Sequence, residues 1–250
     1  MKNEIARLET PIDVMYLIHE ALTVEAASVQ KLIENMELGS SLQPFRAAFN
    51  FWATALMYHA DIEDQNMTGP MTDFQQARDN ETEHAELGGM LEALTGSLAR
   101  ADRRGLEEQV RHAIVALHDE QHTELMERLE DVLACLDDEI GRTRVIARTR
   151  RHLYGRIVEL KICQDDHLES EEAFVLPEVR ERLSVAQQLE LARKLLVDEG
   201  SDNPDWVYDW VARSIDSDKQ AQLSQLRAQY EAVGSGAQRS QYYLDQAADT

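Results

Sequence analysis

The stretch His167–Val179, HLESEEAFVLPEV, combines one histidine, four acids and a proline at short spacing. His167 and Glu171 are four residues apart, so on a helix their side chains project from the same face, one turn apart. A neutral imidazole and a carboxylate placed in this way can bind one cation, or two neighbouring cations if the carboxylate bridges them. Glu172 adds a second acid. Pro177 cannot continue the hydrogen-bond ladder, so the pattern predicts that the helix ends there.

The same pattern occurs earlier, in Tyr58–Pro70, YHADIEDQNMTGP. His59 and Glu63 have the four-residue spacing, Asp64 takes the place of the second acid, and Pro70 follows. One such pair is weak evidence, because helices contain many histidines and glutamates. Two pairs, each near the end of a long helix with an apolar stripe, indicate a duplicated metal-binding arrangement.

Composition predicts an all-α protein. The 250 residues are rich in Leu, Ala, Glu, Gln and Arg and contain only 11 Gly and 5 Pro, which favours helices. The net charge of −22 argues against nucleic acid and anionic membranes as partners. We find no run near the ~20 apolar residues that a membrane span needs, and the first residues lack the apolar core of a signal peptide. Cys135 and Cys163 fall on apolar helix positions, so we expect reduced core thiols and a cytoplasmic location.

The apolar periodicity predicts a series of long helices. The first begins at Thr10-Pro11 and carries His19; the second begins at Pro44 and ends near Glu63; the third begins near Asp73 and carries His84. Further helices are expected over 106–140, 142–172, 184–197, around Trp206 and Trp210, and over 216–232. We expect a break near His118-Asp119, where Asp119 could cap a new helix, and a disordered tail over 234–250.

The candidate ligands share one property: each falls on or beside the apolar stripe of a long helix. They are His19, His59, Glu63, His84, His167 and Glu171. A stripe of this kind forms the core of a bundle, where a carboxylate is costly unless it is paired or bound to metal. Four imidazoles and two carboxylates suit two iron or manganese ions better than one tetrahedral zinc. The alternative is an all-helical scaffold with histidines in its core.

These residues resemble the hemerythrin-like HHE cation-binding family. The matching elements are His19, Tyr58-His59-x-x-x-Glu63-Asp64, Glu83-His84-x-x-Leu87 and His167-x-x-x-Glu171-Glu172 followed by Pro177. The resemblance covers residues 10–180 and implies an up-down-up-down four-helix bundle. It also implies two non-haem iron ions, ahead of manganese or zinc, with an oxo or hydroxo bridge. Glu63 and Glu171 would bridge the ions, and histidines would fill the terminal positions.

The spacing departs from the family pattern at the third helix. His84 lies 83 residues before His167, which is longer than usual for the family, whereas His122 lies 45 residues before it. The chain therefore contains an inserted helical segment over about 99–140, and a helical C-terminal extension follows over 181–233. The third-helix ligand stays open: His84 is the first choice, His122 the second and His118 the third.

The resemblance implies that the protein binds or reduces O2, NO or peroxide. The alternative is an iron- or redox-responsive regulatory module whose fold depends on metal occupancy, with the C-terminal helices as the surface for a protein partner. No residue in the sequence can be assigned as a proton donor, and no reductant is indicated. Whether the protein turns over, stores or senses its ligand therefore stays open. The oligomeric state stays open as well.

Overall fold

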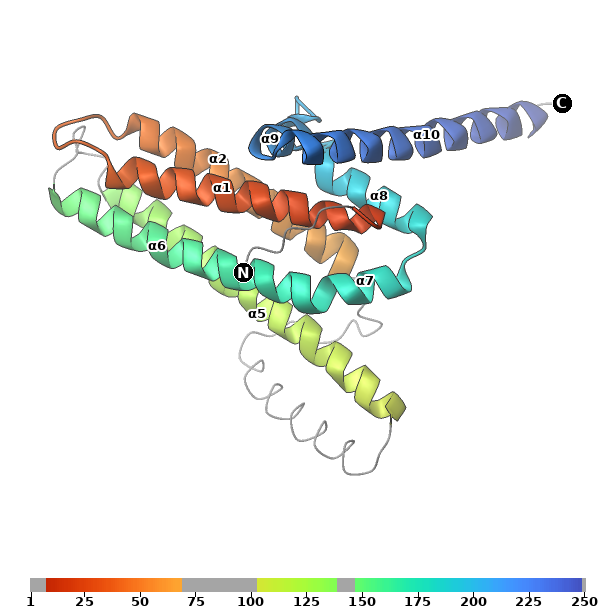
Figure 1. Cartoon of the computed structure of the whole chain (residues 1–250), viewed down its shortest axis with the longest axis horizontal. Coiled ribbons are helices and arrows are strands. Elements are labelled where there is room, and N and C mark those ends of the chain that lie inside the picture. Colours follow the sequence, from red (N-terminus) through yellow and green to blue (C-terminus); the bar gives the residue numbers. More distant parts are fainter. Residues whose placement is uncertain (1–7, 69–102, 139–146, 249–250) are drawn as a thin grey trace. The chain divides into compact units, whose positions relative to one another are not determined.

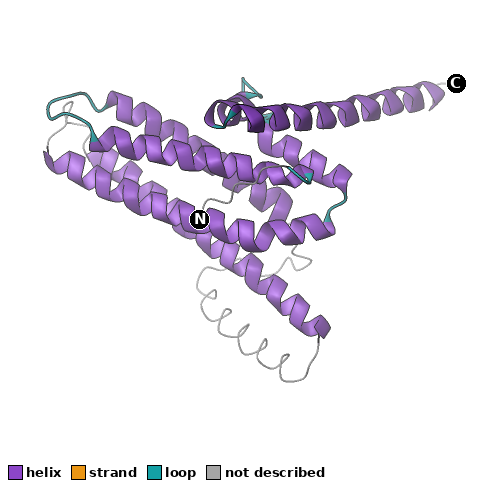
Figure 2. Cartoon of the chain, viewed as in Figure 1, coloured by secondary structure: helices purple, strands orange, loops and turns teal. Residues whose placement is uncertain are grey.

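The computed structural model describes residues 8–68, 103–138 and 147–248, and it is all-helical over these ranges (Figures 1 and 2). No strand is present among these residues, which confirms the all-α prediction. The chain divides into two compact units. One contains Met1–Val24 and Leu176–Thr250, and the other contains Glu25–Val175. The predicted third helix, with His84, lies outside the described residues.

The long-helix unit, Glu25–Val175, contains the end of helix α1 (Val14–Glu34) and three further helices. These are α2 (Gln43–Glu63), α5 (Arg103–Asp138) and α6 (Ala147–Ser170). Gly39, at φ 88°, occupies a left-handed conformation in the turn between α1 and α2, which glycine adopts without strain. α5 and α6 run alongside each other (Figure 1), joined by hydrogen bonds from Arg156 to Asp131 and from Gln121 to Ser170.

The prediction of a break at His118-Asp119 is wrong. α5 continues without interruption from Arg103 to Asp138 and carries both His118 and His122. Asp119 is exposed on the outer side of this helix, while His118 and His122 are buried. The buried positions continue at helical spacing through Leu125 and beyond. One uninterrupted helix therefore buries this whole face, and no new helix start is needed at Asp119.

Pro177 does not end a helix either. α6 stops at Ser170 and is followed by a π-helical turn, Glu171–Val175, and then by α7 (Leu176–Arg182). Pro177 stands in the first turn of α7, where a missing backbone N–H costs little. A matching π-helical turn, Asp64–Thr68, follows α2. Both His-x-x-x-Glu motifs therefore span or adjoin the junction between an α-helix and a π-helical turn.

The core of the long-helix unit is a set of stripes, each with an apolar end and a polar end; the polar end comes last on α2 and α6 and first on α5. On α2 the buried stripe consists of Phe45, Phe49, Trp52, Leu56, His59 and Glu63. On α6 and the turn after it, the stripe consists of Leu153, Ile157, Leu160, Gln164, His167 and Glu171. On α5 it consists of His118, His122, Leu125, Leu129 and Val132. Each stripe keeps the i, i+3/i+4 spacing, so its polar end occupies core positions.

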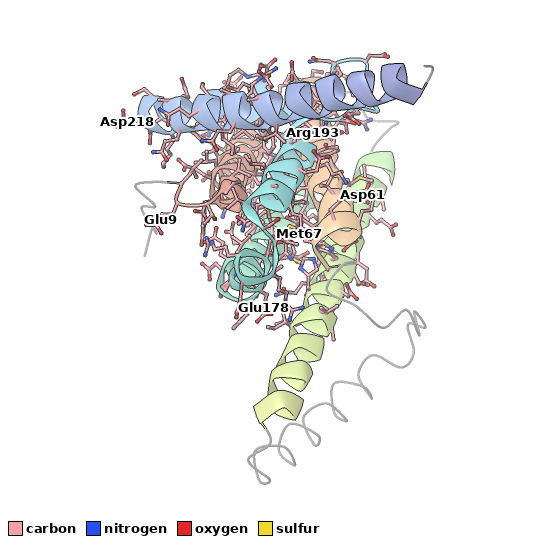
Figure 3. All side chains as sticks on the ribbon, turned by 90° about the vertical axis from the view of Figure 1, so that its right-hand side faces the viewer. Glu9, Asp61, Met67, Glu178, Arg193 and Asp218 are labelled. Atoms are coloured by element: carbon pink, nitrogen blue, oxygen red, sulfur yellow. The ribbon has the colours of Figure 1, made fainter. Side chains whose placement is uncertain are left out.

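Side-chain contacts hold these helices at a fixed register. The indole N–H of Trp52 donates to the side-chain oxygen of Gln164 at 2.7 Å, which joins α2 to α6. At the end of α2, Met67 is buried and is labelled among the interior side chains in Figure 3, whereas Asp61 is exposed. At this end of the helix, the side that carries Met67 faces the core and the side that carries Asp61 faces solvent.

The second unit joins the start of the chain to the C-terminal helices. The carboxylate of Asp13 accepts hydrogen bonds from the backbone N–H groups of Glu9 and Thr10 and from the guanidinium of Arg180. These contacts fix the start of α1 and confirm the helix start predicted at Thr10-Pro11. The helices that follow are α8 (Val185–Leu196), α9 (Trp206–Ser214) and α10 (Ser217–Ala248).

The end of the chain differs from the prediction. The sequence places the end of the last helix near residue 232 and disorder beyond it, but α10 continues to Ala248. Gly234 and Gly236 are weak breakers among Ala, Gln and Arg, which favour helix. Cys163 is a free thiol, as expected, but it is only partly buried and so does not lie in the core.

Candidate metal centre

Six buried histidines and glutamates that could hold a metal ion lie together in the long-helix unit, and they come from three helices and one π-helical turn. α2 supplies His59 and Glu63 in its last turn. α5 supplies His118 and His122, and the end of α6 with its π-helical turn supplies His167 and Glu171. None of the six is more than 6% exposed. A π-helical turn shifts the residues beside it relative to a regular helix and is frequent at functional sites, so these turns help to aim Glu63 and Glu171.

The first group contains His59, Glu63 and Glu171. Each offers a ligand atom within 4.8 Å of the others. The His59 Nε2 lies 2.8 Å from Oε1 of Glu63 and 3.8 Å from Oε2 of Glu171. Two carboxylates and an imidazole thus face one another from α2 and the turn after α6.

The second group contains His118, His122 and His167, which also offer ligand atoms within 4.8 Å of one another. The Nε2 atoms of His122 and His167 are 3.2 Å apart. The rings of His118 and His122, one turn apart on α5, have centroids 4.1 Å apart. The two ring nitrogens of His118 have no hydrogen-bond partner among the described residues.

The two carboxylates lie between these groups. Glu63 places Oε1 against His59, while its Oε2 lies 3.6 Å from Nε2 of His122 and 3.9 Å from Nε2 of His167. The Oε2 of Glu171 lies 3.8 Å from Nε2 of both His59 and His167. Each carboxylate therefore reaches histidines of both groups.

The electrostatics of the protein without metal follow from this crowding. Burial opposes ionisation of Glu63, but the neighbouring His59 and His122 outweigh it and hold its pKa well below the usual value. Burial also opposes protonation of His122, yet its contacts with Asp64 and Glu63 raise its pKa to about 10. Burial lowers the pKa of His118 and of His167, and the charge on His122 lowers them further. The buried carboxylates thus favour the protonated, positively charged form of His122.

Asp64, the acid that follows the first motif, contacts the histidine group from outside. Its Oδ1 lies 2.9 Å from Nδ1 of His122 and 3.9 Å from Nε2 of His118. Asp64 is the first residue of the π-helical turn after α2 and is 43% exposed, so solvent reaches its carboxylate.

A small pocket adjoins the centre between α5 and the π-helical turn after α6. Its lining includes His118 and Glu171, together with Ile114, Leu117, Gln121, Ser170, Phe174 and Val175. Its volume is about 10 Å³, measured by the positions available to the centre of a water molecule. That volume is close to the space that one water needs. Phe174, at the pocket, is 48% exposed.

The structure brings together six of the residues that the sequence ranked as ligands or alternatives. His59, Glu63, His122, His167 and Glu171 meet, and His118, the third choice, meets them too. The signal for His118 is its four-residue spacing from His122, the same spacing that singled out the other motifs. His19 is buried on α1 at 3% exposure, and its role as a ligand stays a prediction. His84 lies outside the described residues.

Comparisons with known proteins found no relative of this chain. No family model matches the chain, and neither a curated protein nor a solved structure matches it. Within the described ranges, none of the helices has the length and apolar character needed to span a membrane.

Proposed function

We propose that this chain is a non-haem di-iron protein that binds or reduces O2, NO or peroxide. The observation that carries the proposal is the position of Glu63 and Glu171, each within reach of histidines of both groups. Two buried carboxylates flanked by four imidazoles form a donor set that suits two borderline divalent ions. In this proposal the histidine group would hold one ion, His59 would hold the other, and the two carboxylates would bridge.

The proposed architecture is a hemerythrin-like four-helix bundle. α2, α5 and α6 would be three of its helices, and α1, with His19, would be the fourth. The sequence pattern supports His19 as a further ligand, because it stands beside the apolar stripe of its helix. The sequence pattern predicts an inserted segment over residues 99–140, but α5 occupies most of that range and in this proposal is a helix of the bundle itself; helices α8 to α10 would form the C-terminal extension.

Charge supports a resident cation. Glu63 and Glu171 are at most 1% exposed, and the ionised form of a carboxylate in that setting needs a compensating positive charge. Without metal, the proton on His122 supplies part of it, as the raised pKa of that residue indicates. Divalent ions would supply the compensation in full, and when bound they would provide redox chemistry and an open position for a small ligand.

The size of the pocket supports a ligand of two or three atoms. Space for about one water molecule beside His118 and Glu171 excludes an organic substrate unless the walls move. Ile114, Leu117 and Val175 make part of the wall apolar, and the hydrogen-bonded pair of Gln121 and Ser170 supplies a polar edge. O2, NO and peroxide fit this combination of small volume and mixed polarity.

Metal analysis and an absorption spectrum of the aerobically purified chain test the proposal. We expect two irons per chain and charge-transfer bands in the near ultraviolet. One zinc per chain, or no metal under any loading condition, would remove the di-iron proposal. Helicity measured with and without iron tests the regulatory alternative, which requires the fold to change with metal occupancy.

A further inference from the structure

The hydrogen bond between His122 and Asp64 decides which nitrogen of His122 faces the centre. A histidine presents two distinct ring nitrogens, and the partner of one sets the role of the other. Here Nδ1 lies 2.9 Å from Asp64 Oδ1, while Nε2 lies 3.6 Å from Glu63 and 3.2 Å from His167. Nδ1 therefore points outward and Nε2 points inward.

We propose that Asp64 is a positioning residue that holds His122 with Nδ1–H donated to its carboxylate and Nε2 presented to Glu63 and His167. The proposal rests on the di-iron function proposed above and deepens it by naming the residue that prepares one ligand. A carboxylate that accepts from the outer nitrogen of a metal-binding histidine fixes the orientation of the ring and increases its basicity.

The local structure explains why Asp64 can do this. Glu63 and Asp64 are consecutive, but Glu63 is the last residue of α2 and Asp64 is the first residue of the π-helical turn. Glu63 is fully buried and faces the centre, whereas Asp64 remains 43% exposed. One junction therefore delivers two consecutive acids to one histidine, Glu63 towards Nε2 and Asp64 towards Nδ1.

The tests compare the full-length chain with the variants Asp64→Ala, Asp64→Asn and Asp61→Ala. Asp61 is an exposed acid near the end of α2, so Asp61→Ala removes the same charge and serves as the control. Asparagine keeps an acceptor oxygen for His122 Nδ1–H but carries no charge. Iron(II) titration gives the affinity and the number of ions bound. Nitrogen NMR of the zinc-loaded chain shows which nitrogen of His122 carries the proton.

We expect Asp64→Ala to bind iron about 10- to 100-fold more weakly while still binding two ions at saturation. Asp64→Asn should recover part of the loss, and Asp61→Ala should match the parent. The zinc-loaded parent should show a slowly exchanging Nδ1–H of His122, and Asp64→Ala should lose that protection. If the weaker binding of Asp64→Ala came from a general loss of folding, Asp64→Asn would not recover it. Recovery of affinity in Asp64→Asn therefore indicates a positioning role for Asp64.

Two results would overturn the inference while leaving the di-iron centre intact. The first is parent-like affinity together with an unchanged His122 signal in Asp64→Ala. The second is saturation at one ion instead of two, because Asp64 would then be a direct ligand. If the parent chain itself binds no iron and no zinc, the proposed function fails and the positioning role fails with it.

Discussion

The indole Nε1 of Trp52 lies 2.7 Å from the side-chain oxygen of Gln164, and both side chains have no exposed surface. Trp52 stands two turns before His59 on α2, and Gln164 stands one turn before His167 on α6. The bond therefore fixes the register of the two helices that end in the His-x-x-x-Glu motifs. A slip of one turn, about 5.4 Å, would separate the histidines that now meet.

The first prediction is that Trp52→Phe destabilises the metal-free protein by about 1–3 kcal/mol, because the buried amide of Gln164 loses its partner. Urea denaturation followed by circular dichroism measures the loss. Replacing both partners, in Trp52→Phe with Gln164→Leu, should recover part of it, since no buried polar group is then left without a bond. Equal stability of the parent and the single variant would show that the bond does not set the register.

The second prediction concerns Glu63 and Glu171, the two carboxylates that we propose bridge the ions. Glu63→Ala and Glu171→Ala should each bind fewer iron ions, because each removes a side chain that reaches both histidine groups. Iron content after reconstitution and gel filtration is the measurement. Glu172→Ala is the matched control: it removes the next acid, which is only partly buried, and should keep most of the iron. Full iron and unchanged melting in both carboxylate variants would show that neither residue is a ligand.

The third prediction concerns the histidines of α5. His122→Ala and His118→Ala should each lose iron, with His122→Ala losing more, because the Nε2 of His122 lies 3.6 Å from Oε2 of Glu63 and 3.2 Å from Nε2 of His167. His84→Ala serves as the comparison, since the sequence pattern favours His84. Loss of iron in His84→Ala with retention in His122→Ala would assign the third-helix ligand to His84.

The fourth prediction is that acid releases the metal. An imidazole must be neutral to bind a metal ion, so protons compete with the metal below the pKa of each histidine. His122, with a pKa of about 10 in the metal-free protein, is in competition already at neutral pH, whereas the lowered pKa values of His118 and His167 delay their protonation to more acidic solution, so binding should weaken steadily as the pH falls. Bound iron should therefore be greater at about pH 7.5 than below about pH 6. Iron content after dialysis across that range checks the direction. Retention down to about pH 4 would contradict a histidine-rich centre.

The fifth prediction concerns the pocket beside His118 and Glu171. Leu117→Trp should fill it and slow the binding of NO or azide to the iron-loaded protein by about tenfold, equivalent to about 1.4 kcal/mol. Stopped-flow absorbance measures the rate. Leu133→Trp places the same side chain at an exposed position on α5 and should leave the rate unchanged. Equal rates in the two variants would mean that ligands enter by another route.

Local sequence patterns were enough to predict much of the candidate site. The four-residue spacing of His59 with Glu63 and of His167 with Glu171 depends only on helix geometry, so it could be predicted from the residues alone. The helix start at Thr10-Pro11 and the break around Gly39 follow from local backbone preferences in the same way. The all-helical fold follows from composition and from the apolar stripes.

The errors arose where a local signal competes with packing. Asp119 could cap a helix, but α5 continues past it because its buried face runs from His118 through Leu125 without a gap. Pro177 predicts the end of a helix. The π-helical turn before it instead leads into α7, where the proline stands in the first turn. Local preference differs by at most a few kcal/mol between these outcomes, and burial of a whole helix face exceeds that.

The sequence by itself determined that the chain is helical, where its two His-x-x-x-Glu motifs lie, and which face of each helix carries them. Only the tertiary structure decided that His118 and His122 join His167, that Glu63 and Glu171 each reach histidines of both groups, and that Asp64 contacts Nδ1 of His122. The physical reason is range. Spacing along one helix follows from its 3.6-residue turn, whereas contacts between α2, α5 and α6 depend on register and on the two π-helical turns, which packing sets.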